Sequence, residues 1–502
     1  LRSRSCGDAL GFGWLDLAIV IVYLTGVTAL GAYFRRQRGL QDYFLGGGAT
    51  PWWAISLSIV ATETSTLTII GTPALAFGGN LAFLQLVLGY ILARFIISFL
   101  LLPQYFSGQL YTAYQYIERR FGGATRRLAA GLFLVTRALA DGVRIWAIAI
   151  VVQLLLPRVF QLLTGETLSF AELTAVVAVM LLTFVYTYLG GMKAVIWTDV
   201  VQFFIYVVGG LAALLCLLAE IPGGWETVTS QLGDKLSVFD FTFSLTTTYT
   251  FWSGILGGTF LTLASHGTDQ LMVQRLLAAP NLRASQRALI ASGFIVFAQF
   301  VIFLLVGVLL YAYYPFAGKP LPAFALDHPD RIFPLYIVEQ LPTGVSGLLV
   351  AGVLAAAMST SSATLNSLAA STVVDFYQPL LGAGADEAAL LRRSRWTTVV
   401  WGFILIFLAM LARSWGPVLE AGLKIASVTY GALLGLFLLG RLVPRATPTG
   451  AAVGMSAGLI AMLYVVFGTS LAWTWYVLLG TLVTFLTGLL VSVLTSPAEA
   501  KR

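Results

Sequence analysis

Residues 58–68 of this 502-residue chain place six hydroxyl side chains and Glu63 in the middle of an apolar run, and Gly71 and Pro73 follow. Hydroxyl groups bond readily to their own helix, so a threonine-rich stretch alone says little. The added carboxylate and the helix breakers favour an interrupted helix whose carbonyls face a cavity. Carbonyl and hydroxyl oxygens in such a break suit a hard monovalent cation such as sodium.

Residues 264–270 (ASHGTDQ) form a second polar segment inside an apolar run. The glycine, His266 and Asp269 together predict a second broken helix. A single buried histidine is more often a satisfied hydrogen-bonding residue than a ligand. The chain contains only two histidines, and His328 lies in a predicted outer loop, so the sequence indicates no transition-metal site.

Residues 355–367 form a third segment rich in alanine and serine. Small residues of this kind also let membrane helices pack closely, which explains the alanines well. Ser359, Ser362 and Asn366, however, recur at three- and four-residue spacing and therefore form a polar stripe on one helix face. This stripe is a candidate partner for the two broken helices.

The composition requires that membrane helices position these segments. Hydrophobic residues make up 58% of the chain and charged residues only 10%, whereas a soluble domain carries roughly a quarter charged residues. Two cysteines exclude a disulfide framework. With about 20 apolar residues needed for each crossing, we predict thirteen spans, near residues 14–34, 51–77, 81–105, 124–156, 168–190, 194–219, 249–275, 286–314, 343–376, 394–412, 418–440, 447–468 and 472–495.

The net charge of +7 is scattered between apolar runs, which indicates membrane orientation and no nucleic-acid partner. Placing the N-terminus outside puts most lysines and arginines in inner segments, for example 119–127, 392–395 and 441–445. The positive-inside rule therefore predicts an outside N-terminus and a cytoplasmic C-terminus. We expect the membrane to be the plasma (inner) membrane.

Several charged residues fall within the predicted spans. A charge at mid-bilayer costs at least about 2.5–3.5 kcal/mol, so each needs a partner, a wet cavity or an ion. We expect Arg94, Arg137 and Asp141 to form structural ion pairs or to lie near an interface, and Lys424 to extend toward the outer surface.

Five motifs together resemble the sodium:solute symporter family, whose members carry sugars, vitamins, monocarboxylates, iodide, proline or sialic acid. They are DYFLGGG at 42–48, YQYIERRF at 114–121, YTYLGGMKAVIWTDVVQ at 186–202, DQLMVQR at 269–275 and the run 359–367. The similarity extends from about residue 14 to residue 465, and GGMKAVIWTD is its most specific part.

The resemblance implies an all-α polytopic membrane protein with a LeuT-like core of two inverted five-helix repeats that works by alternating access. We predict an N-terminal extra helix and inner loop at 1–50, a first repeat at 51–220, a second repeat at 249–441, and two C-terminal helices with a short tail at 442–502.

The resemblance also implies sodium ligands. A first site would take the carbonyls of Ala61, Thr64 and Ala356 and the hydroxyls of Ser359 and Thr360. A second site, present in some members, would use Ser65, Thr68, Asp199, Ser362 and position 363. Ala363 lacks the expected hydroxyl, so one sodium ion is predicted and the second is left open. Asp199 has an alternative role as a helix-packing or water-network acid.

The corresponding substrate candidates line the central cavity of family members; in this chain they are Glu63, Gln85, Arg144, Ser265, His266, Asp269 and Gln299. The chain resembles proline carriers in having an acid at the position of Glu63. It resembles sialic-acid carriers in having an arginine near the position of Arg144. Arg144 would hold a carboxylate and Glu63 an ammonium group. Alternatively, Glu63 and Arg144 pair with each other or with Asp141.

We therefore predict a sodium symporter that imports a small organic solute, with a carboxylate or zwitterion favoured. A sodium/sugar symporter, or a transporter-like sensor without transport, is the alternative. A sensor kinase would need a kinase domain, and the segment after residue 495 is too short for one. The sequence contains no H-E-x-x-H motif or comparable nucleophile constellation, so it does not predict an enzyme. A channel is the remaining alternative.

Overall fold

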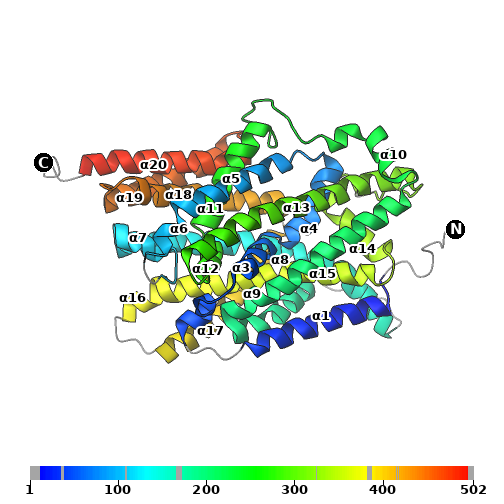
Figure 1. The fold of residues 1–502 in the computed structure, drawn as a ribbon, viewed down its shortest axis with the longest axis horizontal. Helices are drawn as coiled ribbons and strands as arrows, with labels where there is room; N and C mark the ends of the chain where they lie inside the picture. Colours follow the sequence, from blue (N-terminus) through cyan, green and yellow to red (C-terminus); the bar gives the residue numbers. More distant parts are fainter. Residues whose placement is uncertain are drawn as a thin grey trace.

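A computed structural model describes residues 12–34, 39–107, 110–164, 172–323, 325–381, 387–413, 415 and 418–495. These residues form helices that lie side by side along the long axis of the molecule (Figure 1). The helices are α1 (Trp14–Tyr33), α2 (Leu40–Leu45), α3 (Trp52–Glu63), α4 (Thr66–Gly78), α5 (Leu84–Leu100), α6 (Leu102–Tyr105), α7 (Tyr114–Phe121), α8 (Gly123–Thr164), α9 (Glu172–Glu220), α10 (Gly224–Gln231), α11 (Gly258–Gly267), α12 (Gln270–Leu277), α13 (Leu282–Phe316), α14 (Ile332–Glu339), α15 (Val345–Ser371), α16 (Gln378–Leu381), α17 (Glu387–Ala412), α18 (Val418–Leu442), α19 (Pro448–Gly468) and α20 (Tyr476–Thr495).

Helices occupy the described part of each of the thirteen predicted spans; residues 168–171 of the fifth lie outside the described residues. Within the described ranges, nine helices are long and apolar enough to cross a membrane, and the bent pair α3–α4 makes a tenth candidate. The other three predicted spans correspond to α5, to the first half of α9, and to the segment that contains α11 and α12. The first eleven residues and those after residue 495, which belong to the predicted terminal units, lie outside the described residues.

Both predicted helix breaks are present in the structure. Helices α3 and α4 meet at an angle of 60°. Helix α11 ends at Gly267, and α12 begins at Gln270 after an extended Asp269 whose side chain accepts a hydrogen bond from Leu271 N at 2.9 Å. Both interruptions therefore lie at the polar segments that the sequence indicated.

Helix α9 contains the boundary between two predicted spans. Gly191 within it has a φ of 58° and a ψ of −159°, so the chain changes direction there. A side chain at this position would also meet the backbone of Tyr43, because a Cβ would lie 2.8 Å from the Tyr43 carbonyl oxygen. Glycine is needed for both reasons.

Helix α15 lies at the centre of the bundle, and nearly all of its residues are buried. It packs against α9, α8, α3 and α4. Helix α13 packs against α3 and α4, while α11 packs against α5. The two broken helices and the polar stripe of α15 therefore surround the same central region.

Candidate functional site

The break between α3 and α4 releases backbone carbonyls, and those of Ala61 and Thr64 are among them. In a continuous helix, Ala61 O would accept from Ser65 N, but Ser65 N donates to Glu63 O at 2.9 Å. Similarly, Thr68 N donates to Ser65 O at 2.8 Å and not to Thr64 O. The freed carbonyls of Ala61 and Thr64 are the two that the resemblance implied as sodium ligands.

Helix α15 supplies the remaining three predicted ligands of the first sodium site. Thr360 Oγ1 donates to Ala356 O at 3.0 Å, and Ser359 Oγ donates to Asp199 Oδ1 at 2.6 Å. A hydroxyl that donates its only proton keeps its oxygen lone pairs for a cation. Because α15 packs against both α3 and α4, these oxygens and the freed carbonyls belong to adjoining elements.

Asp199 already has a positively charged protein partner. Arg275 Nη2 lies 3.1 Å from Asp199 Oδ2, and neither side chain is exposed. Ser58 Oγ donates to the same carboxylate oxygen at 2.5 Å, and Arg275 Nε donates to Ser58 Oγ at 3.0 Å. This network matches the alternative role of Asp199 as a helix-packing acid. The sequence analysis did not identify Arg275 as its partner.

The other hydroxyls predicted for a second sodium site bond to nearby backbone. Thr68 Oγ1 donates to Glu63 O at 3.3 Å, and Ser362 Oγ donates to Ser359 O at 2.9 Å. Ser65 is the residue that precedes α4 and also lines the central cavity.

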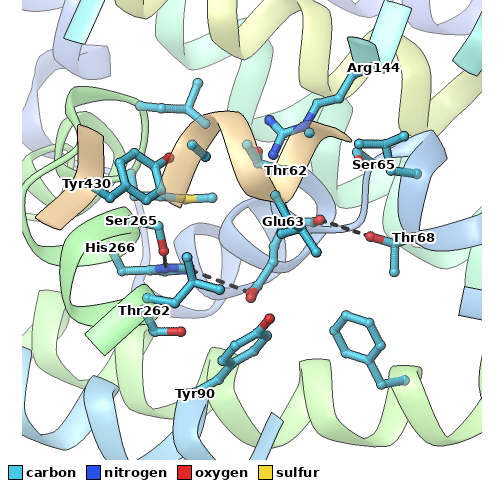
Figure 2. A pocket seen from close by; sticks show the side chains of 18 of the residues that line it. Thr62, Glu63, Ser65, Thr68, Tyr90, Arg144, Thr262, Ser265, His266 and Tyr430 are labelled. Atoms are coloured by element: carbon cyan, nitrogen blue, oxygen red, sulfur yellow. Dashed lines mark hydrogen bonds and ion pairs between the residues drawn. The ribbon is translucent and has the colours of Figure 1, made fainter. Parts of the chain in front are cut away.

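A central cavity lies beside the α3–α4 break, between α5, α8, α11 and α18 (Figure 2). Four of the predicted substrate residues line it: Glu63, Arg144, Ser265 and His266. The rest of its wall is mostly hydroxyl, aromatic and aliphatic; it includes Thr62, Ser65, Thr68, Thr72, Phe83, Tyr90, Thr262, Phe300, Leu423, Ala426 and Tyr430.

The other three predicted substrate residues lie outside the cavity wall. Gln85 accepts a hydrogen bond from Asp240 N at 3.0 Å and so holds the loop before α11. Gln299 Oε1 accepts from Thr64 Oγ1 at 2.7 Å, next to the helix break. Asp269 is buried behind Tyr430, whose hydroxyl donates to Asp269 Oδ2 at 2.6 Å.

At one end of the cavity, Glu63 forms an ion pair with Arg94 of α5. His266 Nε2 lies 3.5 Å from Glu63 Oε2 and 3.2 Å from Arg94 Nη2, and Ser265 Oγ lies 2.8 Å from His266 Nδ1. Figure 2 shows the Glu63 side chain directed toward His266 and Tyr90. The pairing of Glu63 with Arg144 that the sequence left open is therefore absent, and Arg94 takes that place.

Arg144 borders the cavity from α8. Its Nη1 donates to Asp141 Oδ1 at 2.6 Å, which is the other pairing that the sequence left open. Arg137, also on α8, lies 2.6 Å from Asp141 Oδ2 and 3.1 Å from Asp269 Oδ2, and its Nη1 donates to Tyr430 OH at 3.0 Å. Arg137 and Asp141 thus form the structural ion pair that was expected.

The sequence analysis did not assign several cavity residues. Tyr90, Phe300 and Tyr430 gave no signal, because aromatic residues are common in apolar spans and their orientation depends on helix packing. Arg94 was recognised as a charge that needs a partner, but Glu63 was not identified as that partner.

The sequence profile of the sodium:solute symporter family matches residues 43–458 of the chain. The chain belongs to this family. It is 31% identical to the sodium/sialic acid symporter NanT of Aliivibrio fischeri over 96% of the chain and 94% of that protein. It is 30% identical to human sodium-coupled monocarboxylate transporter 1, and 29% identical to the human sodium/iodide cotransporter. These matches cover 91% and 93% of the chain and 74% and 72% of those proteins, respectively.

Solved structures agree with this family assignment. A sodium-coupled sialic acid symporter in a substrate-bound, outward-open state has a TM-score of 0.86 and 27% sequence identity, with 97% of this chain and 99% of that one covered. The nucleobase-cation symporter Mhp1 has a TM-score of 0.58 at 14% identity over 90% of this chain and 94% of that one, which shows the fold alone. The chain is thus an integral membrane symporter with a LeuT-like fold, couples a small solute to sodium, and is not an enzyme.

Proposed function

We propose that this symporter imports a small organic carboxylate together with one sodium ion by alternating access. The observation that carries the proposal is the state of Arg144, which lines the cavity with 21% of its side chain exposed. Only Nη1 is occupied, by Asp141, and Nε is buried without a partner among the described residues. Such a guanidinium is suited to bind a carboxylate through two N–H donors.

The relatives support an anionic solute, because their names specify sialic acid, monocarboxylates or iodide. Within the cavity, Ser265 and His266 are proposed to contact the solute beyond its carboxylate. The other three residues are proposed to act from behind the cavity wall. Gln85 holds the outer loop, Asp269 holds Arg137, and Gln299 holds the helix break.

The proposed sodium site consists of the carbonyls of Ala61, Thr64 and Ala356 with the hydroxyls of Ser359 and Thr360. The released carbonyls of α3 support it, as do the two hydroxyls that already donate their protons. This set supplies only neutral oxygens, which suits a monovalent ion that must leave again.

A second sodium at Ser65, Thr68, Asp199 and Ser362 is not part of the proposal. Arg275 already neutralises Asp199, and Ala363 supplies no hydroxyl oxygen. A further cation beside Arg275 would face direct charge repulsion.

For topology, we propose an outside N-terminus, a cytoplasmic C-terminus, and the four units 1–50, 51–220, 249–441 and 442–502. The start of α1 and the end of α20 lie at opposite ends of the bundle (Figure 1). Helix α7, which carries Arg119 and Arg120, lies at the same end as the last residues of α20. The positive-inside rule places that end in the cytoplasm.

The test is uptake into liposomes that contain the purified symporter. Radiolabelled N-acetylneuraminate and lactate should enter only with an inward sodium gradient, and Arg144→Gln should reduce entry of the transported acid by about tenfold or more, because a charge-assisted pair is lost. Ser359→Ala should raise the sodium concentration needed for half-maximal uptake. Ser367→Ala is the matched control, since Ser367 is also buried on α15 and its hydroxyl, within the described part of the chain, bonds only to Thr364 O at 3.0 Å.

Equal uptake with potassium in place of sodium would contradict the proposed coupling. Full uptake by Arg144→Gln would contradict the proposed carboxylate site. Melting curves of the purified symporter with added solutes test the solute class. If glucose raised the melting temperature of the symporter while N-acetylneuraminate, lactate and pyruvate did not, the solute class would be a sugar.

A further inference from the structure

Glu63 is the acidic residue on the cavity wall, and its charge is compensated from behind. Its side chain is 13% exposed, whereas Arg94, its ion-pair partner, has no exposed surface. Arg94 Nε also donates to Ser292 Oγ at 3.1 Å, so the guanidinium is fixed on the protein side of the carboxylate. A solute in the cavity therefore meets a carboxylate that is already neutralised.

The contacts of Glu63 leave one carboxylate oxygen available. The bond from Arg94 and the contact with His266 both involve Oε2. Among the described residues no partner is recorded for Oε1. This oxygen can accept a hydrogen bond from an uncharged donor such as a hydroxyl or an amide N–H.

His266 adds no charge at this end of the cavity. A guanidinium can only donate, so His266 Nε2, at 3.2 Å from Arg94 Nη2, accepts the hydrogen bond. The proton is then on Nδ1, which donates to Ser265 Oγ at 2.8 Å. The geometry corresponds to a neutral imidazole.

The other end of the cavity is balanced as well. Arg137 and Arg144 face Asp141 and Asp269, so two positive and two negative charges are present. A solute carboxylate bound at Arg144 adds one negative charge, which balances the positive charge of the sodium ion. An additional ammonium group on the solute would lose its hydration on entering the cavity. The described cavity wall offers no unpaired carboxylate to replace the water, so this desolvation is costly in a membrane interior.

We propose that Arg94 cancels the charge of Glu63 and thereby sets the substrate class: a carboxylate whose second polar group is an uncharged hydroxyl or amide, with solutes that carry an ammonium group rejected. Arg94 is a positioning residue, since it acts through Glu63 and has no surface in the cavity. The inference rests on the proposed carboxylate transport and specifies its selectivity. It also revises the expectation that Glu63 binds an ammonium group.

The test compares solutes that share a skeleton and differ only in charge. Lactate and alanine form a three-carbon pair, and gluconate and 2-amino-2-deoxygluconate form a six-carbon pair. In sodium-driven uptake into liposomes, the wild-type symporter should prefer the hydroxy acid of a transported pair by about tenfold or more, because an uncompensated charge must be desolvated.

Two single variants change the net charge of the Glu63–Arg94 pair in opposite directions, and a double variant leaves it unchanged. Arg94→Gln leaves Glu63 unpaired and should shift the preference toward the amino acid by about tenfold or more. Glu63→Gln leaves Arg94 unpaired and should increase uptake of malate relative to lactate. The double variant Glu63→Gln/Arg94→Gln is neutral again and should keep the wild-type preference for hydroxy acids.

These outcomes separate the inference from the proposed function. Equal wild-type uptake of lactate and alanine, both abolished by Arg144→Gln, would overturn the inference and leave the carboxylate proposal intact. An unchanged preference in Arg94→Gln or Glu63→Gln, with a wild-type melting temperature, would overturn it too. If Arg94→Gln fails to fold, Glu63→Gln and the double variant still decide the question. No sodium-driven uptake of N-acetylneuraminate or any member of the two pairs would reject both proposals.

Discussion

Asp199 and Arg275 form an ion pair in which neither side chain is exposed. Removing one charge leaves the other buried without compensation, which costs about 3–5 kcal/mol. Asp199→Asn should therefore lower the melting temperature of the purified symporter strongly, and Asp199→Asn/Arg275→Gln should recover most of the loss. Melting curves in detergent, measured on all three proteins, check this order.

The same double variant distinguishes a structural role of Asp199 from sodium binding. Because the proposed sodium ligands are neutral oxygens, the sodium concentration that gives half-maximal uptake should stay close to the wild-type value. A large increase, in a variant with a recovered melting temperature, would instead make Asp199 a sodium ligand.

The cavity residues illustrate what could be predicted from the sequence at the residue scale. The resemblance to the family implied Glu63, Arg144, Ser265 and His266 as cavity residues, and polar or charged residues inside apolar spans are costly and so need a specific environment. The partner of Glu63 could not be identified, since Arg94 and Arg144 are both arginines within predicted spans. Only the tertiary arrangement of the helices determines which of them reaches the carboxylate.

At the element scale, Asp16 of α1 caps the N-terminus of α15. Its Oδ1 accepts hydrogen bonds from Gly344 N at 2.7 Å and Gly347 N at 2.5 Å, and its Oδ2 accepts from Gly13 N at 2.8 Å. A buried carboxylate at this position satisfies free amides and interacts favourably with the helix dipole. The contact links the peripheral helix α1 to the helix that carries Ser359.

Substitutions at Asp16 should therefore destabilise the symporter in a graded way. Asp16→Asn keeps one acceptor oxygen and should lower the melting temperature less than Asp16→Ala, which leaves the buried amides unpaired at a cost of about 1–3 kcal/mol each. Asp42→Asn, which changes an acid in the first turn of the short helix α2, provides a comparison. Equal melting temperatures for wild type and Asp16→Ala would show that the cap does not hold α15.

The helix breaks could be predicted because glycine, proline and clustered polar residues mark them in the sequence. The short helices were not predicted: α7 and α12 have eight residues each, and their boundaries depend on tertiary contacts. For example, Gln270 Nε2 donates to Tyr111 O at 3.0 Å, and Ala113 N donates to Gln270 Oε1 at 2.8 Å. Bonds of this kind join segments more than 150 positions apart, and sequence periodicity gives no information about them.

At the scale of the whole molecule, the charges around the cavity and the helix break cancel. Among the described residues, four arginines pair with four carboxylates there: Arg94 with Glu63, Arg275 with Asp199, and Arg137 and Arg144 with Asp141 and Asp269. A sodium ion alone would add one uncompensated positive charge, and a monocarboxylate alone would add one negative charge. Bound together they restore neutrality, so each should favour the binding of the other.

This balance predicts reciprocal binding in the absence of any gradient. Sodium should lower the Kd of the transported carboxylate by about 5–150-fold, the range typical of coupled sites, and the carboxylate should lower the Kd of sodium by the same factor. Titration calorimetry of each ligand, with and without the other, measures both factors, and potassium provides the control ion. Arg144→Gln should remove the coupling while sodium still binds, because its sodium ligands are untouched. Independent binding of the two ligands would mean that the coupling of transport to sodium arises from the conformational change and not from charge balance in the site.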